Sequence, residues 1–151
     1  MIGLDEDHHI FRHIKKSWLD GEFVDPAAFR LKTLDNGQLE DGLSINWVEY
    51  FQRPTPKEAV QPLRELLQRK GRTIGGESKF ALLNFGVAKA AAAKFTKVEI
   101  VMDEEPEDPS HRVWQALRGA ASALSRALAG RPEMLTCLYV NCHKWCNVNA
   151  L

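Results

Sequence analysis

The chain has 151 residues, of which 44% are hydrophobic and 26% are charged. This length suits a single domain spanning residues 1–151, and the composition excludes a largely disordered chain. Lys and Arg together number 20, and so do Asp and Glu. No apolar run reaches the roughly 18 residues that a membrane-spanning helix needs, so we expect no contact with a membrane.

The two ends of the chain are expected to differ from the rest. Residues 1–8 are acidic, lack the pattern of a secretory signal and are predicted to be loose. Residues 136–151 contain all three cysteines, and an odd cysteine count without such a signal argues against a disulfide framework. Both observations favour a cytoplasmic protein.

Three strands are predicted in the first third of the chain. Residues His9–Ile14 alternate in the manner of a strand. Residues 28–32 and Leu43–Trp47 are rich in aromatic and apolar side chains, and Asn-Gly and Asp-Gly dipeptides lie between them. We therefore expect these two segments to pair as a hairpin.

The middle of the chain carries the clearest helix signal. Apolar residues recur at helical spacing over residues 57–70, and Gly71 follows as a stop. Residues 80–85, 97–102 and 135–140 are predicted strands. The alanine-rich residues 87–95 fit either a short helix or a continuation of the preceding strand, and the sequence leaves both open.

A second main helix is predicted to begin at Asp108. Its carboxylate would serve as the N-cap, and Pro109 would occupy the first helical position, where its missing N–H is not needed. Together these elements predict an α+β fold, with a mainly antiparallel sheet of about five strands and two main helices packed on one face.

Four short segments, FRHI, DPAAFRL, DGLSINW and DPSH, follow one another between residues 10 and 112. In this arrangement the chain resembles a group of small uncharacterised bacterial proteins. The resemblance implies a bacterial source and one compact α+β domain, and it carries no catalytic residue across. The C-terminal segment CLYVNCHKWC is not part of this pattern.

The C-terminal segment contains thiol and imidazole groups of the kind that bind zinc, at Cys137, Cys142, His143 and Cys146. Cys142 and His143 are adjacent, however, and two neighbouring residues reach a single ion with difficulty. We therefore expect independent thiols and no cofactor, with a zinc site as the alternative.

Two further groups are candidates for catalysis, and whether the protein is an enzyme stays open. Two imidazoles and two carboxylates, if they converge, could bind a divalent metal or transfer protons; these are His13, Asp103, Asp108 and His111. The alternative group is spread over three predicted strands: Arg12 and His13 lie on the first, Ser44 on a later one and Glu99 on a late one. This order is similar to that of NAD-handling residues in ADP-ribosyltransferase-like folds. Neither group is accompanied by a glycine-rich phosphate-binding motif.

The function favoured by the sequence is a small cytoplasmic binding or accessory module that acts through a protein partner. Tyr50, Phe51 and Trp18 are the predicted contacts, because aromatic rings near turns either anchor a partner or close the core, and the sequence leaves both open. Trp47 continues the face of Leu43 and is expected to be buried instead.

The third alternative is a nucleic-acid binder. Residues 53–97 contain ten Lys and Arg residues and three acids, and clustered cations bind phosphates. Acidic blocks flank this segment, which makes the alternative unfavourable. It requires that four cations share one exposed face, namely Arg64, Lys70, Arg72 and Lys79.

Overall fold

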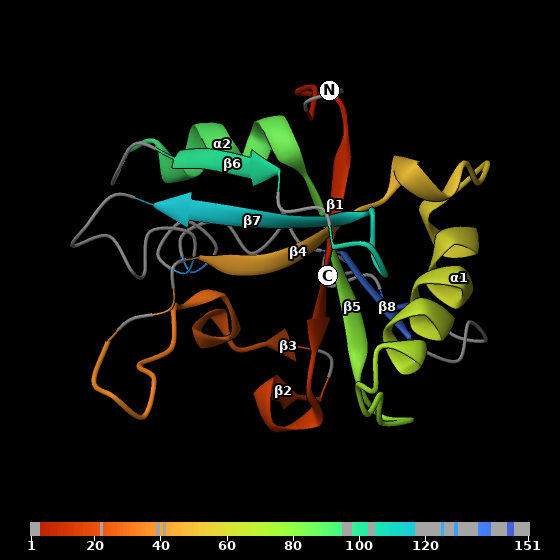
Figure 1. Cartoon of the computed structure of the whole chain (residues 1–151), viewed down its shortest axis with the longest axis horizontal. Helices are drawn as coiled ribbons and strands as arrows, with labels where there is room; N and C mark the ends of the chain where they lie inside the picture. The colour runs from red at the N-terminus through yellow and green to blue at the C-terminus, as the bar shows by residue number, and fades with distance from the viewer. Residues whose placement is uncertain are drawn as a thin grey trace.

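Figure 1 shows the computed structural model of the chain, which describes residues 4–21, 23–38, 40, 42–94, 98–102, 105–116, 125, 129, 136–139 and 145–146. Its central sheet has the order β6-β7-β4-β1-β5-β8-β9, and every neighbouring pair is antiparallel. The strands are β1 (His9–Ile14), β4 (Leu43–Trp47), β5 (Lys79–Asn84), β6 (Val98–Met102), β7 (His111–Ala116), β8 (Thr136–Tyr139) and β9 (Trp145–Cys146).

The remaining elements connect and cover this sheet. A separate two-stranded ribbon pairs β2 (Leu19–Asp20) with β3 (Phe23–Val24). The structure has two α-helices, α1 (Pro56–Arg69) and α2 (Phe85–Ala92). Three short 3₁₀ helices precede them in the chain: η1 (Lys16–Trp18), η2 (Pro26–Phe29) and η3 (Glu49–Phe51). Among the described residues, no helix is both long and apolar enough to cross a membrane.

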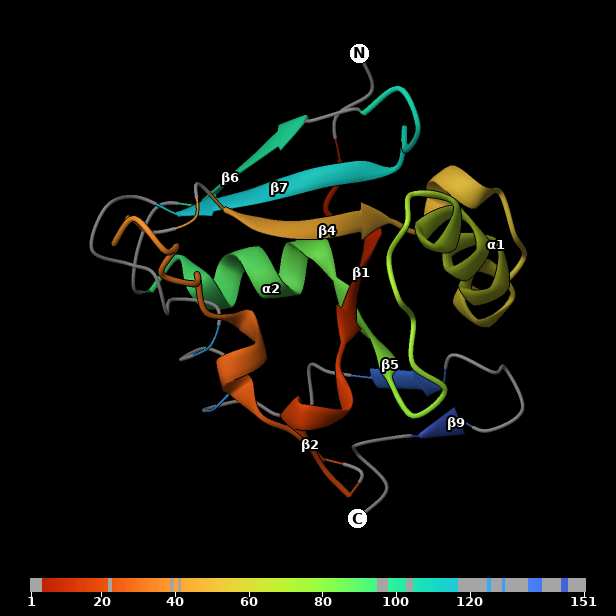
Figure 2. The ribbon, with the colours of Figure 1, turned by 60° about the horizontal axis from the view of Figure 1, so that its bottom comes forward.

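Strand β1 lies in the middle of the sheet and contributes to two hydrophobic cores. Successive side chains of a strand point to opposite faces. Ile10 and Ile14 belong to the core that includes α2 and η2, whereas Phe11 belongs to the core that includes α1. Figure 2 shows the two helices on either side of β1. The α+β class and the mainly antiparallel sheet are confirmed, with seven strands where about five were expected, and α1 and α2 pack into different cores.

The predicted hairpin between residues 28–32 and Leu43–Trp47 is wrong, although β4 has the predicted bounds. Residues Pro26–Phe29 form η2 instead, because the Asp25 carboxylate accepts a hydrogen bond from the backbone N–H of Ala27 at 2.8 Å and Pro26 starts the helix. The buried residues Ala28 and Phe29 then pack into the core, and β4 pairs with β1 and β7.

The start of the predicted second main helix, at Asp108, is also wrong, although Ser125 and Ala129, within its later part, are helical. Residues His111–Ala116 form β7, which fits between β4 and β6, and the backbone before it turns at a bridge between Glu105 and Asp108. Asp108 is therefore not an N-cap. Of the two alternatives for residues 87–95, the structure shows the helix, α2. The Asn84 side chain caps its start by accepting a hydrogen bond from the backbone N–H of Val87 at 2.9 Å.

Candidate functional site

Strands β1 and β4 separate soon after they meet. Their register contains two residue pairs, Ile10 with Trp47 and Phe11 with Asn46. Where the strands part, a cavity of about 400 Å³ is lined by residues of both, including Arg12, His13 and Ser44. We call it the β1–β4 cavity. Small-molecule sites in proteins typically have about this volume.

Cations dominate the lining of the β1–β4 cavity. They come from four separate parts of the chain: Arg12 from β1, Lys15 from the segment after it, Lys32 from the loop after η2, and Arg72 from the loop after α1. Of the described residues that line the cavity, Glu40 is the one carboxylate. Like charges gathered around a cavity repel one another, so this arrangement favours a bound anion.

Arg12 spans the gap between the parted strands. Its Nε donates a hydrogen bond to the carbonyl oxygen of Ala28 at 2.8 Å, and its Nη1 donates to the carbonyl oxygen of Ser44 at 3.0 Å. Burial lowers the pKa of Arg12 to about 10; Glu40 raises the pKa in part and Arg72 lowers it further. Arg12 therefore keeps its charge at neutral pH and holds it at a fixed place.

Trp18 forms an aromatic wall behind two of these cations. The guanidinium carbon of Arg12 lies 6.0 Å from the centre of the Trp18 ring, and Nζ of Lys32 lies 5.2 Å from it. Cations at this distance are attracted by the electrons of the ring face. Trp18 therefore helps to hold both cations beside the cavity.

His13 is the neutral group among these charges. Its pKa is lowered to about 4, first by burial and then by Arg72, Lys15 and Arg12. The ring packs against Phe80 with 5.5 Å between ring centres, and no described residue forms a hydrogen bond with its buried Nε2. The ring is therefore a neutral part of the cavity lining at neutral pH.

A second cavity, of about 430 Å³, adjoins the first and shares His13, Lys15 and Thr73 with it. Its other wall is the loop at residues 75–78, so we call it the loop cavity. The hydroxyl of Ser78 donates a hydrogen bond to the carbonyl oxygen of Gly75 at 2.6 Å. This bond closes the loop into a tight turn.

Asp108 lies in a buried polar network next to the β1–β4 cavity. Its side chain is 0% exposed and accepts hydrogen bonds from Asn46 at 3.0 Å, Ser110 at 2.6 Å and Lys70 at 3.2 Å. Lys70 also forms an ion pair with Glu105. Burial raises the pKa of Asp108, but the hydrogen bonds from Ser110, Lys70 and Asn46 outweigh it, so the pKa lies below its usual value.

The predicted group of two imidazoles and two carboxylates is therefore divided. His13 lines the β1–β4 cavity, whereas Asp108 belongs to the network and the His111 ring nitrogen lies 3.8 Å from Glu105. Asp103 lies outside the described residues. This division offers no support for a metal site built from these four residues.

The structure brings together three of the four residues in the second predicted group, that of Arg12, His13, Ser44 and Glu99. Arg12, His13 and Ser44 all line the β1–β4 cavity. The backbone of Glu99 pairs with Gln115 on the far side of β7, so two strand spacings separate Glu99 from β4. The sequence does not identify Lys15 and Lys32 as site residues. Each lies near the other cations only in the folded chain, and no local sequence pattern indicates this.

The aromatic residues predicted to contact a partner lie in two places. Trp18 lies in the wall of the β1–β4 cavity. Tyr50 and Phe51 form η3, where Tyr50 is 38% exposed and Phe51 packs partly against the core under α1. Trp47, expected to be buried, is half-buried and lies 5.2 Å from the ring of His8.

The C-terminal thiols are described only in part. Cys137 on β8 lies directly opposite Cys146 on β9 in the sheet register. Cys142 and His143 lie outside the described residues. The expectation of independent thiols therefore stays a prediction, as does the alternative of a zinc site.

The four cations that a nucleic-acid binder would need on one exposed face do not form such a face. Lys79 is 2% exposed, and Lys70 is held by Glu105 and Asp108. Arg72 is exposed and faces the β1–β4 cavity instead. The condition that a nucleic-acid binder would have to meet is therefore not fulfilled by these residues, because the fold directs them to different surroundings.

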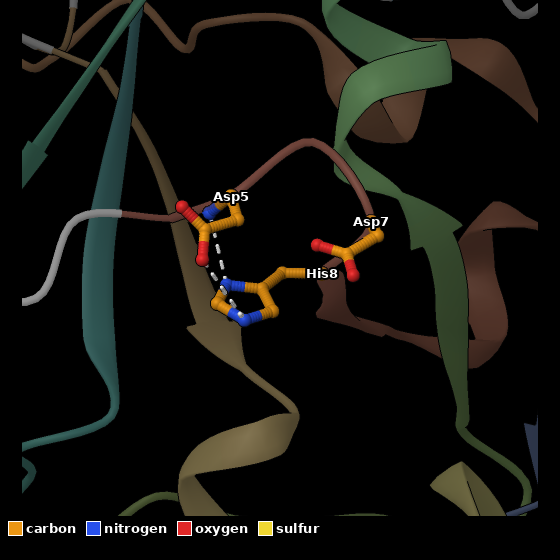
Figure 3. Close-up of side chains that lie close together, drawn as sticks. All are labelled: Asp5, Asp7 and His8. Atoms are coloured by element: carbon orange, nitrogen blue, oxygen red, sulfur yellow. Dashed lines mark hydrogen bonds and ion pairs between the residues drawn. The ribbon is translucent and has the colours of Figure 1, made fainter.

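Figure 3 shows another cluster with the donor atoms that metals prefer, formed by Asp5, Asp7 and His8. Their candidate ligand atoms lie within 4.8 Å of one another. Nδ1 of His8 already accepts a hydrogen bond from the backbone N–H of Asp5 at 2.9 Å, and both carboxylates are exposed. Exposed acidic groups of this kind are common without a metal, so we do not treat the cluster as the functional site.

Comparison of the chain with protein-family models, with curated proteins and with solved structures found no match. The function must therefore be inferred from the geometry and chemistry of the site.

Proposed function

We propose that this protein is a cytoplasmic binding module that takes a small phosphate-bearing ligand in the β1–β4 cavity. One observation carries the proposal: four cations from four parts of the chain surround this cavity, and a single carboxylate accompanies them among the residues that line it. Phosphate suits such a lining, because each of its oxygens accepts charge-assisted hydrogen bonds from Arg and Lys.

We expect the variant Arg72→Gln to bind orthophosphate about tenfold more weakly than the unaltered protein, because it loses one charge-assisted hydrogen bond. Arg72 is exposed, so the fold should be unaffected. Isothermal titration calorimetry provides the measurement. Arg53→Gln is the matched control, since Arg53 is an exposed cation that does not line the cavity. Equal affinities of the two variants, or no orthophosphate binding by the unaltered protein, would contradict the proposal.

Anion binding should also depend on pH through His13. Burial and three cations hold its pKa at about 4 in the free protein, and a bound anion favours the protonated ring and raises this pKa. The complex then holds a proton that the free protein lacks, so affinity should increase as the pH falls from about 6.5 towards 4. Sulfate is the suitable probe, because its own charge is constant over this range. His13→Gln should abolish the pH dependence, and a flat profile for the unaltered protein would exclude this role.

A second candidate function is an enzyme that handles NAD or ADP-ribosyl groups. The convergence of Arg12, His13 and Ser44 on one cavity favours it, because the sequence predicts that chemistry for a group that includes these three residues. Incubation of the protein with NAD should then release nicotinamide, and Ser44→Ala should abolish the release. NAD that stays intact would leave the binding module as the better description.

A protein partner remains part of the proposal, with its contact at η3. The exposed ring of Tyr50 lies edge-on to Phe51, with 5.4 Å between ring centres. We expect Tyr50→Ala to leave the melting temperature and phosphate affinity nearly unchanged while it reduces co-purification of the partner. A large loss of stability would assign Tyr50 to the core instead.

A further inference from the structure

The β1–β4 cavity and the loop cavity meet at a common wall formed by His13, Lys15 and Thr73. Each has a volume suited to a small polar group and its coordinating atoms, at about 400 Å³ and about 430 Å³. The shared wall carries the exposed ammonium of Lys15, the exposed hydroxyl of Thr73 and the ring of His13. A ligand that extends from one cavity to the other would pass these three polar groups.

The charges indicate how much negative charge the ligand carries. Four cations and the carboxylate of Glu40 give the lining of the β1–β4 cavity a net charge of about +3, and a single phosphate group, with about −1.5 to −2 at neutral pH, leaves part of this charge uncompensated. A second linked phosphate would supply the remainder. The loop cavity adds Lys16 and Glu77, which form an exposed ion pair with each other, so its additional lining carries no net charge.

The aromatic wall of the first cavity argues against a nucleobase as the second part of the ligand. Lys32 and Arg12 already lie over the Trp18 ring, so this ring face is not open for stacking. The loop cavity is lined by glycine and polar residues and contains no aromatic side chain other than His13 among its described lining. Both cavities therefore suit small charged groups.

We propose that the ligand is a diphosphate, with one phosphate group in the β1–β4 cavity and the linked phosphate group in the loop cavity. This inference rests on the proposed function, because it specifies the anion that the same site takes. Lys15 and Thr73 would contact the ligand where the two groups join, and Lys16 would contact the second group.

Titration calorimetry with inorganic pyrophosphate and orthophosphate tests the inference. We expect pyrophosphate to bind the unaltered protein at least about tenfold more tightly than orthophosphate. Charge alone could produce such a preference, so a variant must block the loop cavity without changing charge. Gly75→Leu does so: Gly75 lines the loop cavity, a Cβ at this position meets nothing within 4 Å, and its backbone does not have a positive φ.

Gly75→Leu should retain the affinity for orthophosphate within about twofold and lose most of the preference for pyrophosphate. Lys16→Gln, a change at an exposed ion pair that costs little stability, should weaken pyrophosphate alone by about threefold. The diphosphate proposal would be overturned if the unaltered protein bound both anions equally, or if both variants kept the full preference for pyrophosphate. The proposed function as a phosphate-binding module would still stand. Failure of orthophosphate to bind at all would instead overturn the proposed function.

Discussion

Replacement of Asp108 by alanine should lower the free energy of unfolding by about 3–5 kcal/mol, because it removes one partner from a buried charged network. The carboxylate is 0% exposed, and its loss leaves the amide of Asn46 and the largely buried ammonium of Lys70 without this acceptor. Urea denaturation followed by circular dichroism would measure the change.

Asp25→Ala provides the matched control for Asp108→Ala. Both aspartates precede a proline, but Asp25 is exposed and caps only the short helix η2, so its loss should cost about 0.5–2 kcal/mol. If the two variants lost similar stability, Asp108 would be a simple cap after all. Asp108→Asn should fall between them, since it keeps a side-chain oxygen and loses the charge.

The same network should destabilise the protein in acid. The hydrogen bonds from Ser110, Lys70 and Asn46 hold the pKa of Asp108 below its usual value despite burial, and the hydrogen bond from Lys70 does the same for Glu105. A carboxylate whose pKa is lowered by folding contributes stability above its unfolded pKa of about 4, and this contribution is lost as the pH falls through the folded value. The loss should be smaller in Asp108→Ala, where Glu105 alone still contributes.

Trp114→Ala should cost about 3–5 kcal/mol, as expected for the removal of a large aromatic side chain from a packed core. Trp114 is 2% exposed and lies edge-on to Phe85 of α2, with 6.2 Å between ring centres. The half-buried Trp47 is the matched control on the neighbouring strand, and its replacement by alanine should cost clearly less. Chemical denaturation of both variants would measure the two losses of stability. A larger loss for Trp47→Ala than for Trp114→Ala would show that the core is centred on Trp47.

The elements that were predicted correctly are those that local sequence determines. The apolar spacing before Gly71 is sufficient to define α1, and alternation is sufficient to define β1. The two Asp-Pro dipeptides show the limit of local signals. The first starts η2 and the second lies in a turn before β7, where pairing with β4 and β6 on both sides overrides the tendency to form a helix.

The candidate site could be predicted only in part for a related reason. Arg12, His13 and Ser44 were selected individually, but the cavity exists because β1 and β4 pair through two residues and then separate. Lys32 and Arg72 join it from loops that follow different helices. Such convergence depends on strand order and register, which are properties of the whole sheet.

The central position of β1 makes the two halves of the molecule interdependent. Ile10 and Phe11 are consecutive residues, yet each contributes to a different core. Loss of β1 from its place between β4 and β5 would remove residues from both cores at once. The chain should therefore unfold in one cooperative transition, and the backbone amides of β1 should be among the slowest to exchange with solvent deuterium.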